Sequence, residues 1–219
     1  MKKVFFIAVA LLPRIQDYAQ GCDNLIYFRA NTEYVYDITG NKTGSVIKCQ
    51  YRTNNVEQSG KWKIAHVNAI LNLNGSYAST FSGNVMCDGT VIRLDAKLFA
   101  GDANQDFKDS YVEYPLQMSV GQNLQDGKFT TSVTSGGRTA TMVVDIVDRK
   151  VTGKEKITVP AGTFDCFIIT SMYDAGFLED GKKKSASRSA HTSWVAPGFG
   201  LVKGESARGK IELVSVEKK

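Results

Sequence analysis

The sequence predicts an all-β protein, a barrel or a sandwich, and three observations support that class. Apolar and polar residues alternate with period two along most of the chain, as in strands with one buried face and one solvated face. Turn signals such as Asn74-Gly75 and Asp88-Gly89 recur at intervals of about 8–12 residues. An alternation of strands with helices would indicate a parallel sheet, and the sequence does not show one. Because 219 residues can bury one sizeable core, we expect a single domain over residues 21–219.

The first residues have the pattern of a signal peptide. Two lysines precede nine apolar residues (4–12), a run too short to cross a bilayer, which takes about twenty residues. We therefore assign residues 1–20 to a signal-peptide region rather than to a buried strand or helix. Within this region, we favour cleavage after Ala19. The alternative is lipoprotein processing before Cys22, which would leave a lipid anchor there. We favour cleavage after Ala19 over lipoprotein processing, because charged residues separate the apolar run from Cys22.

Composition and charge exclude several classes of protein. With 42% apolar and 22% charged residues, the chain is too apolar to be disordered. Without residues 1–20 it carries 24 Lys and Arg against 21 Asp and Glu. This excess of positive charge is too small to predict nucleic-acid binding. No later apolar run is long enough for a transmembrane span. We expect an exported protein of the periplasm or the periphery of the outer membrane.

In the first half of the chain, alternating stretches are separated by short turns. Residues 33–39 and 47–52 alternate on either side of a Gly-containing turn at 41–44, which predicts a hairpin. The apolar positions of the next stretch change from even to odd numbers near His66, which predicts a bulge or a bend there. Further strands are expected at 77–86 and 90–98.

The middle of the chain contains the only helical signal. Residues 102–110 have apolar residues at a spacing of four, so we expect at most one short helix there, ended by Tyr114-Pro115. The strand expected at 164–173 is apolar on both faces, which is typical of a central strand. The other strands expected in the second half are 129–133, 139–147, 151–159, 190–196, 201–205 and 210–216.

Export permits disulfide bonds, and the exported chain contains Cys22, Cys49, Cys87 and Cys166. Four cysteines allow three full pairings, which only geometry can separate. If one disulfide forms, we favour Cys22 with Cys87, because both lie near the ends of elements. Cys166 lies in an apolar strand and is interpreted as a small buried hydrophobic residue.

Aromatic side chains occur on many of the expected strands. In a closed or half-closed barrel they would meet inside, where they could fill a core or line a pocket for an apolar ligand. Core packing is the default interpretation. The candidate ligand-binding residues are Tyr34, Tyr36, Trp62, Phe107 and Trp194.

The densest basic cluster comprises Lys182, Lys183, Lys184 and Arg188. It follows Glu179-Asp180-Gly181, which has the composition of a hairpin turn. One interpretation is contact with anionic headgroups at a membrane surface. The other, which we favour, is a solvated hairpin tip whose lysines prevent edge-to-edge pairing of strands.

Motifs for catalysis and metal binding are scarce. The chain has two histidines, His66 and His191, and no spacing typical of a catalytic triad, a zinc site or a phosphate-binding loop. We therefore expect no catalytic residues, no metal and no cofactor. The alternatives are a hydrolase that uses carboxylates such as Asp145, Asp148 or Asp165, and a structural or adhesion module without a ligand.

Three segments together resemble a known family. They are VPAGTFDCF (159–167), WVAPGFGLVK (194–203), and YPL (114–116) followed by VGQ (120–122). With Gly21-Cys22-Asp23-Asn24 and the Tyr34-x-Tyr36 strand, they are similar to the TapB-like family of exported envelope proteins of Bacteroides-type bacteria, whose function is unknown. The resemblance implies an antiparallel meander curled into a single closed or half-open barrel, and it supplies no catalytic residues.

From these patterns we expect an exported, non-catalytic envelope protein. Its curved sheet would bind a lipid-like or other amphipathic ligand, such as the acyl chain of a lipid or a lipoprotein. The sequence does not predict the oligomeric state.

Overall fold

The computed structural model describes residues 21–41, 44–100, 111–135 and 138–219. The expected signal peptide (1–20), the expected helix at 102–110 and the candidate ligand residue Phe107 lie outside the described residues. The helices in this part of the chain are short: the 3-10 helices η1 (Cys22–Asn24) and η2 (Ile26–Phe28), and the α-helix α1 (Lys97–Ala100). None of them is long and apolar enough to span a membrane.

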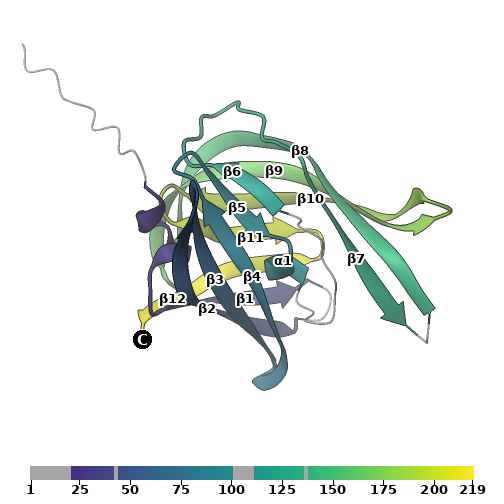
Figure 1. The fold of residues 1–219 in the computed structure, drawn as a ribbon, viewed down its shortest axis with the longest axis horizontal. Helices are drawn as coiled ribbons and strands as arrows, with labels where there is room; N and C mark the ends of the chain where they lie inside the picture. Colours follow the sequence, from purple (N-terminus) through teal and green to yellow (C-terminus); the bar gives the residue numbers. More distant parts are fainter. Residues whose placement is uncertain (1–20, 42–43, 101–110, 136–137) are drawn as a thin grey trace, which may run out of the picture.

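The twelve strands form one antiparallel sheet that curls into a nearly closed barrel (Figure 1). Consecutive strands pair except β6 with β7, and β1 (Thr32–Gly40) pairs with β12 (Gly209–Lys218), so the first and the last strand meet inside the sheet. The unpaired edges are β6 (Tyr111–Pro115) and β7 (Gly127–Ser135), and the gap between them is called the seam. The expected half-open barrel is confirmed.

Strands of the first half form the body of the barrel. Their turns follow the sequence signals: Asn74 and Gly75 have φ of 49° and 82°, the left-handed conformation that a two-residue hairpin turn requires. β6 was not expected, because Pro115 suggested a break there; proline is tolerated because this strand lies at an edge of the sheet. The remaining strands of this half are β2 (Val46–Ser59), β3 (Trp62–Leu73), β4 (Ser76–Cys87) and β5 (Val91–Asp95).

The three longest strands, β8, β9 and β10, lie in the second half, and β7–β10 extend beyond the body as a projecting arm (Figure 1). Residues 139–147 and 151–159, expected as two strands, belong to one strand that is interrupted by register shifts between Val147 and Lys150 and between Val151 and Gly153. Bulges of this kind bend a strand without ending it. The remaining strands are β8 (Arg138–Val159), β9 (Gly162–Glu179), β10 (Lys182–Ala196) and β11 (Gly200–Ser206).

The bulge expected near His66 is present, but its extra residue lies in the partner strand. β2 and β3 pair Thr53 with Val67 and Asn55 with His66, which leaves Asn54 as the bulged residue. Ala65, Val67 and Ala69 of β3 are therefore buried. The period-two pattern along β3 located the irregularity, but it did not show which strand carries the extra residue.

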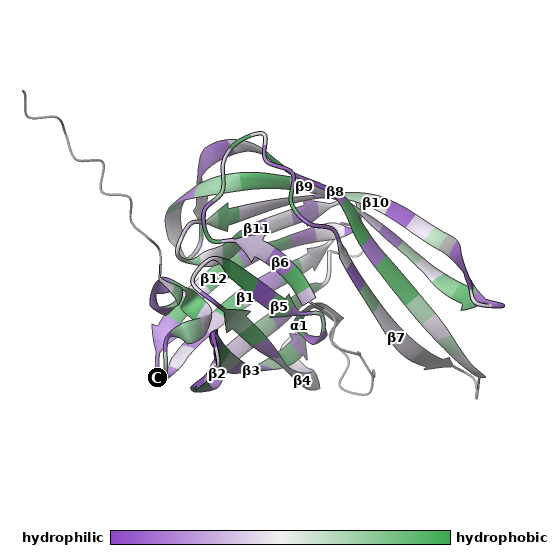
Figure 2. Ribbon diagram, turned by 45° about the horizontal axis from the view of Figure 1, so that its top comes forward, coloured by the Kyte–Doolittle hydropathy of each residue, from purple (hydrophilic) through white to green (hydrophobic). Residues whose placement is uncertain are grey.

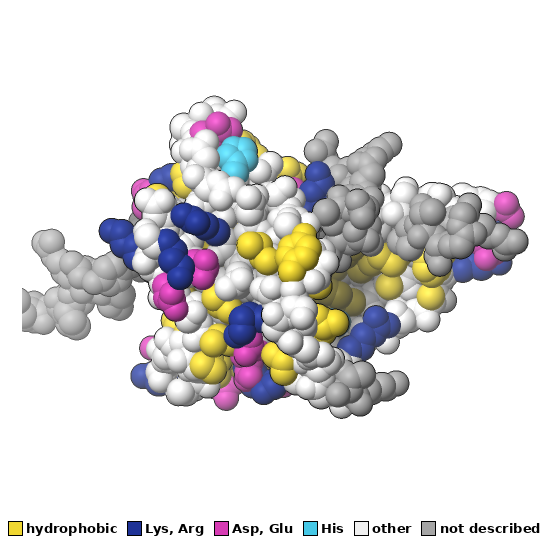
Figure 3. Space-filling model, turned by 90° about the horizontal axis from the view of Figure 1, so that it is seen from below, with side chains coloured by type: hydrophobic (Ala, Val, Ile, Leu, Met, Phe, Trp, Pro, Cys, Tyr) yellow, Lys and Arg dark blue, Asp and Glu magenta, His cyan; other side chains and the backbone are white. Residues whose placement is uncertain are grey.

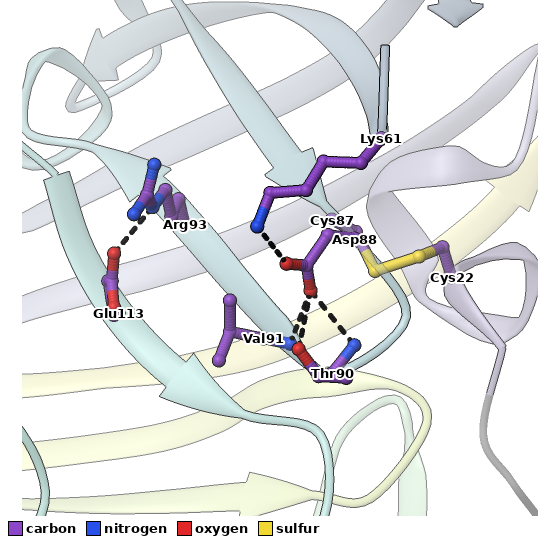
Figure 4. A network of polar contacts seen from close by, with 8 residues as sticks. All are labelled: Cys22, Lys61, Cys87, Asp88, Thr90, Val91, Arg93 and Glu113. Atoms are coloured by element: carbon purple, nitrogen blue, oxygen red, sulfur yellow. Dashed lines mark hydrogen bonds and ion pairs between the residues drawn. A yellow bond between two sulfur atoms is a disulfide. The ribbon is translucent and has the colours of Figure 1, made fainter. Parts of the chain in front are cut away.

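The short helices near the N-terminus form a plug over one end of the barrel; we call residues 22–28 the N-terminal plug (Figure 1). Ile26 and Tyr27 are buried in the core, and the backbone N–H of Ile26 donates to the carbonyl oxygen of Phe199. A disulfide between Cys22 and Cys87, whose Cα atoms are 5.8 Å apart, fastens the plug to β4 (Figure 4). This is the pair favoured from the sequence.

The turn beside this disulfide is ordered by one carboxylate. Oδ1 of Asp88 accepts hydrogen bonds from the backbone N–H groups of Thr90 (2.9 Å) and Val91 (3.0 Å), and Oδ2 is 2.9 Å from Lys61 Nζ (Figure 4). The hydrogen bond from Val91, followed by those from Thr90 and Lys61, holds the pKa of Asp88 well below its usual range. The plug is thus attached next to a rigid turn.

Hydrophobic and hydrophilic residues alternate along many of the strands, as the hydropathy colouring of the ribbon in Figure 2 shows. The largest core cluster centres on stacked tyrosines: the rings of Tyr34 and Tyr51 are 5.2 Å apart and inclined by 4°. Tyr36 packs edge-on against both rings. This cluster fills the barrel on the side of the N-terminal plug.

Candidate functional site

A cavity of about 410 Å³ lies inside the barrel beside the tyrosine cluster. Such a volume is within the range of small-molecule sites, about 300–1,000 Å³. The plug contributes Leu25 and Tyr27, and β5 contributes Ile92 and Leu94. Strands β9–β12 and β1 contribute further residues, among them Tyr173, Val195, Leu201, Ile211 and Ile38. Most of the lining is therefore aliphatic or aromatic.

The cavity exists because one side of the barrel carries small residues. Gly204, Ser206 and Gly209 of β11 and β12 lie along it, opposite the larger Ile92 and Leu94 of β5. Gly209 cannot be larger: a Cβ there would lie 2.3 Å from the carbonyl oxygen of Thr39, in the strand with which β12 pairs. The same small residues that allow the strands to close also leave space inside.

Figure 3 shows hydrophobic side chains in a recess where the projecting arm leaves the body. Two residues near the end of the arm, Phe177 and Leu178, are also exposed hydrophobics. Apolar surface therefore continues from the body of the barrel onto the arm.

Polar residues also line the cavity, among them the charged Glu205, Arg208 and Lys210. One polar pair there is His191 with Ser189. The ring of His191 stacks on Tyr173 with centroids 3.9 Å apart, and its Nε2 is 3.1 Å from the Ser189 hydroxyl. Burial lowers the pKa of His191, and the positive charge of Arg208 lowers it further. His191 is therefore a neutral hydrogen-bonding group at neutral pH.

Near the seam, Tyr114 of β6 also lines the cavity. Behind it is Arg149 of β8, which is only 3% exposed and places its guanidinium carbon 4.6 Å from the Tyr114 ring centroid. A buried arginine beside an apolar cavity is unusual, because charged side chains are rarely buried unless they are paired.

Among the candidate ligand residues, Tyr34 and Tyr36 lie in the core and not in the cavity lining. Tyr34 is fully buried and Tyr36 is 3% exposed. Burial, and then the neighbouring phenol groups, raise the pKa of both hydroxyls well above the usual value. The tyrosine of this cluster that reaches the cavity is Tyr27, of the N-terminal plug.

Both tryptophans are half-buried, and neither belongs to the cavity lining. Trp62 lies under the guanidinium of Arg93, with 4.3 Å between the guanidinium carbon and the ring centroid. Trp194 donates from its indole N–H to Glu155 at 2.8 Å. Its neighbour Val195, by contrast, lines the cavity. These aromatic rings pack against charged side chains.

The basic cluster is largely neutralised by carboxylates. Lys183 Nζ lies 2.6 Å from Asp145 Oδ2 and 3.2 Å from Asp174 Oδ1, and Lys184 pairs with Glu179. The other two cations are Arg188, which is 3.4 Å from Asp148, and Lys182, which is exposed next to the hairpin turn. Three of the four cations considered for contact with an anionic surface are thus paired with carboxylates of the sheet.

The carboxylates considered for a hydrolase are separate from one another and paired with cations. Asp145 pairs with Lys183, and Asp148 with Arg188. Asp165 lies 3.6 Å from Lys156 on an exposed part of the sheet. Within the described residues, no group of three or more His, Cys, Asp and Glu side chains could hold a metal ion.

Sequence reasoning did not propose Tyr114, Tyr173 or Arg149 as functional-site residues. Tyr114 follows the region expected to be helical, and Tyr173 was treated as one residue of a strand buried on both faces. Arg149 falls in the bulge between two stretches that were expected to be separate strands. Only the curvature of the sheet brings these three residues together.

Comparison with known proteins identifies a family and relatives of the same fold. A family model described as DUF3108-like matches residues 30–218. A Bacteroides fragilis protein, provisionally described as exported and with a YmcC-like fold, has a TM-score of 0.68 and 15% identity over 87% of this chain and 97% of its own. A Parabacteroides distasonis protein, provisionally described as a lipoprotein, has a TM-score of 0.69 and 16% identity over 86% and 96%. No curated protein matches. The TapB-like name stays a prediction.

Proposed function

Because the chain belongs to the DUF3108-like family, and because its fold is that of proteins described as exported or as lipoproteins, we propose that it is a non-catalytic cell-envelope protein that binds a lipid-like or other amphipathic ligand. The observation that carries this proposal is the apolar cavity of about 410 Å³ inside the barrel. More of the cavity lining is apolar than polar, although Glu205, Arg208 and Lys210 contribute to it, and such walls suit a ligand that is mainly apolar.

The energetic argument is the burial of hydrocarbon. Each methylene group moved from water into an apolar cavity contributes about 0.8 kcal/mol, which is about fourfold in affinity. A lipid acyl chain or the acyl chain of a lipoprotein would thus bind with an affinity that rises with chain length. A polar metabolite would gain little from these walls.

For the location of the protein, we propose the periplasm or the periphery of the outer membrane. A lipid anchor at Cys22 requires that its sulfur be free to form a thioether, but the disulfide with Cys87 uses that sulfur. The disulfide therefore favours cleavage of a signal peptide over lipidation of Cys22, and it fits an oxidising compartment.

Ligand binding is tested first by native mass spectrometry of protein purified from the envelope of a Gram-negative host. We expect a co-purified species with the mass of a lipid or fatty acid, released on denaturation. In parallel, delipidated protein is titrated with phenylnaphthylamine, a neutral probe that fluoresces in apolar sites. If nothing co-purifies and the probe does not bind, the proposal is rejected.

A pair of variants then locates the site. Ser193 lines the cavity, and Ser193→Phe would fill part of it. Ala190 lies on the same strand but is exposed and outside the lining, so Ala190→Phe is the matched control. We expect the first variant to weaken probe binding about tenfold or more, and the second to leave it unchanged. Equal binding by both variants would place the probe elsewhere.

The non-catalytic part of the proposal has its own test, because the Ser189–His191 contact is the observation that would favour a hydrolase. A serine next to a neutral histidine is the beginning of a nucleophile–base pair. We propose that the contact is structural. We expect no hydrolysis of nitrophenyl esters of short or long fatty acids above the rate of Ser189→Ala. A rate that this substitution abolishes would show an esterase.

A further inference from the structure

Arg149 is a buried cation with few polar contacts. Its side chain is 3% exposed, and its Nη1 donates to the backbone carbonyl oxygen of Gln125, in the segment before β7. The Tyr114 ring covers one face of the guanidinium, at 4.6 Å from its carbon. These contacts fix the orientation of the side chain without neutralising its charge.

The charge of Arg149 has no counter-ion in the described part of the chain. No carboxylate there lies within ion-pair distance of it, and its Nη2 is buried without a hydrogen-bond partner. The adjacent Asp148 pairs instead with Arg188 on the exposed surface. Burying an unpaired charge is costly, so a guanidinium in this position favours any anion that can reach it.

The position of Arg149 connects it to the cavity. Tyr114, which stacks on the guanidinium, lines the cavity, and so does Tyr173. Arg149 also acts on the Tyr173 hydroxyl: its positive charge lowers a pKa that burial, and then Tyr114, raise. Tyr114 belongs to edge strand β6, which pairs with β5 and not with β7. Its ring packs against all three core clusters and contacts both the guanidinium of Arg149 and the cavity.

We propose that Arg149 binds the anionic headgroup, a carboxylate or a phosphate, of an amphiphile whose apolar chain occupies the cavity. This inference rests on the proposed function and adds to it the class of ligand. Guanidinium groups bind both oxyanions through charge-assisted hydrogen bonds. Nη2, which has no partner within the described residues, is the donor that the headgroup would engage. The barrel would then select anionic over neutral amphiphiles.

The experiment compares three probes with the same chain: dodecanoate, dodecyl phosphate and dodecanol. Each displaces phenylnaphthylamine from the delipidated protein, which gives three dissociation constants. We expect one or both anions to bind about tenfold or more tightly than the alcohol, because a hydrogen bond to a charged group adds that much. The ratio between the two anions distinguishes a fatty-acid source from a phospholipid source. Equal affinity for all three probes would overturn the inference.

Variants of Arg149 assign the preference to this side chain. We expect Arg149→Gln to bind dodecanol as the wild type does but to lose the preference for anions. Arg149→Lys should retain part of the preference. Arg188→Gln, which removes an exposed arginine outside the cavity lining, is the control and should change nothing. If Arg149→Gln keeps the full preference, the headgroup is bound elsewhere and the inference is wrong.

Two further results complete the test. If Arg149→Gln does not fold, the wild-type comparison of headgroups and the Arg149→Lys variant decide the question, because neither removes the charge. If none of the three probes binds to the wild type, the proposed function fails as well. Binding of dodecanol without any preference for an anion would leave the proposed function intact and remove only the role of Arg149.

Discussion

The hydroxyl of Tyr36 donates a 2.7 Å hydrogen bond to the carbonyl oxygen of Leu201. This bond joins β1 to β11, which are separated in the sheet by β12. It therefore spans the interior of the barrel between the tyrosine cluster and the cavity, which Leu201 lines. The adjacent inward-facing tyrosine, Tyr34, is fully buried, and its hydroxyl has no hydrogen-bond partner among the residues that the structure describes.

Replacing each of these tyrosines by phenylalanine should give different results. Tyr36→Phe removes a buried hydrogen bond and leaves the Leu201 carbonyl without this donor, so we expect a loss of about 1–2 kcal/mol in the free energy of unfolding. Tyr34→Phe removes only an unpaired hydroxyl, so its stability should stay within about 0.5 kcal/mol of wild type or rise. Urea unfolding measures both. A larger loss of stability for Tyr34→Phe than for Tyr36→Phe would contradict the assignment of the hydrogen-bonded hydroxyl to Tyr36.

Removing the disulfide should strongly destabilise the barrel. Cys22 and Cys87 are 65 residues apart, and closing a loop of that length restricts the unfolded chain by about 4 kcal/mol. We expect the double variant Cys22→Ser, Cys87→Ser to unfold at a lower temperature, measured by circular dichroism. Dithiothreitol should lower the melting temperature of the wild type and leave that of the variant unchanged. A variant that still responds to the reductant would indicate another pairing.

Closure of the barrel depends on Gly209. A Cβ at this position would meet the backbone of β1, 2.3 Å from the Thr39 oxygen, and backbone cannot give way as a side chain can. We expect Gly209→Ala to cost about 2–3 kcal/mol, in line with overpacked positions. Gly21→Ala is the control, because a Cβ there meets nothing within 4 Å. Similar melting temperatures for the two variants would refute the steric argument.

The two free cysteines should be unreactive in the native protein. Burial raises the pKa of Cys49 from 9.0 to about 11, and the pKa of Cys166 likewise to about 11. A rise of two units leaves about a hundredfold less thiolate at pH 8, and only the thiolate reacts with iodoacetamide. Mass spectrometry should show no label on native protein, two labels in denaturant, and four after reduction. Rapid labelling of either cysteine in native protein would contradict its burial.

Lys183 should stabilise the arm, because its positive charge offsets the repulsion between two carboxylates. Asp145 and Asp174 are directly opposite each other on β8 and β9, and like charges in such a pair repel. Lys183 of β10 binds both carboxylates, so Lys183→Gln should lower stability by about 1–2 kcal/mol. Lys184→Gln, which removes an exposed ion pair, should change it by less than about 0.5 kcal/mol.

A third variant identifies the cause of that loss. If repulsion between the carboxylates is responsible, adding Asp145→Asn to Lys183→Gln should recover part of the stability, because one negative charge is then removed. No recovery, with urea unfolding as the measurement, would indicate that the aliphatic part of Lys183 matters more than its charge.

The strands that the sequence predicted correctly are those whose signals are local. Alternation around Tyr34 and Tyr36, and the turn at Asn74-Gly75, depend on neighbouring residues, so they can be recognised without knowing the fold. β6 was missed because Pro115 indicates a break unless the strand is known to be an edge, and an edge is a property of the whole sheet. Similarly, β8 was predicted as two strands, because the bulge that contains Arg149 interrupts the alternation, and only the paired sheet shows that the strand continues.

The sequence by itself determined that the strands alternate and where most hairpins turn, and its patterns left a barrel or a sandwich open. The curled antiparallel meander was implied by the family resemblance. The tertiary structure alone decided which aromatic rings fill the core and which face a cavity. Tyr34 and Tyr173 both lie in stretches expected to be strands, yet one is packed among tyrosines and the other lines a cavity. On the neighbouring strand Tyr34 faces the large ring of Tyr51, whereas Tyr173 faces the small side chain of Ser189 on β10. Such complementarity between distant segments cannot be read from alternation along one strand.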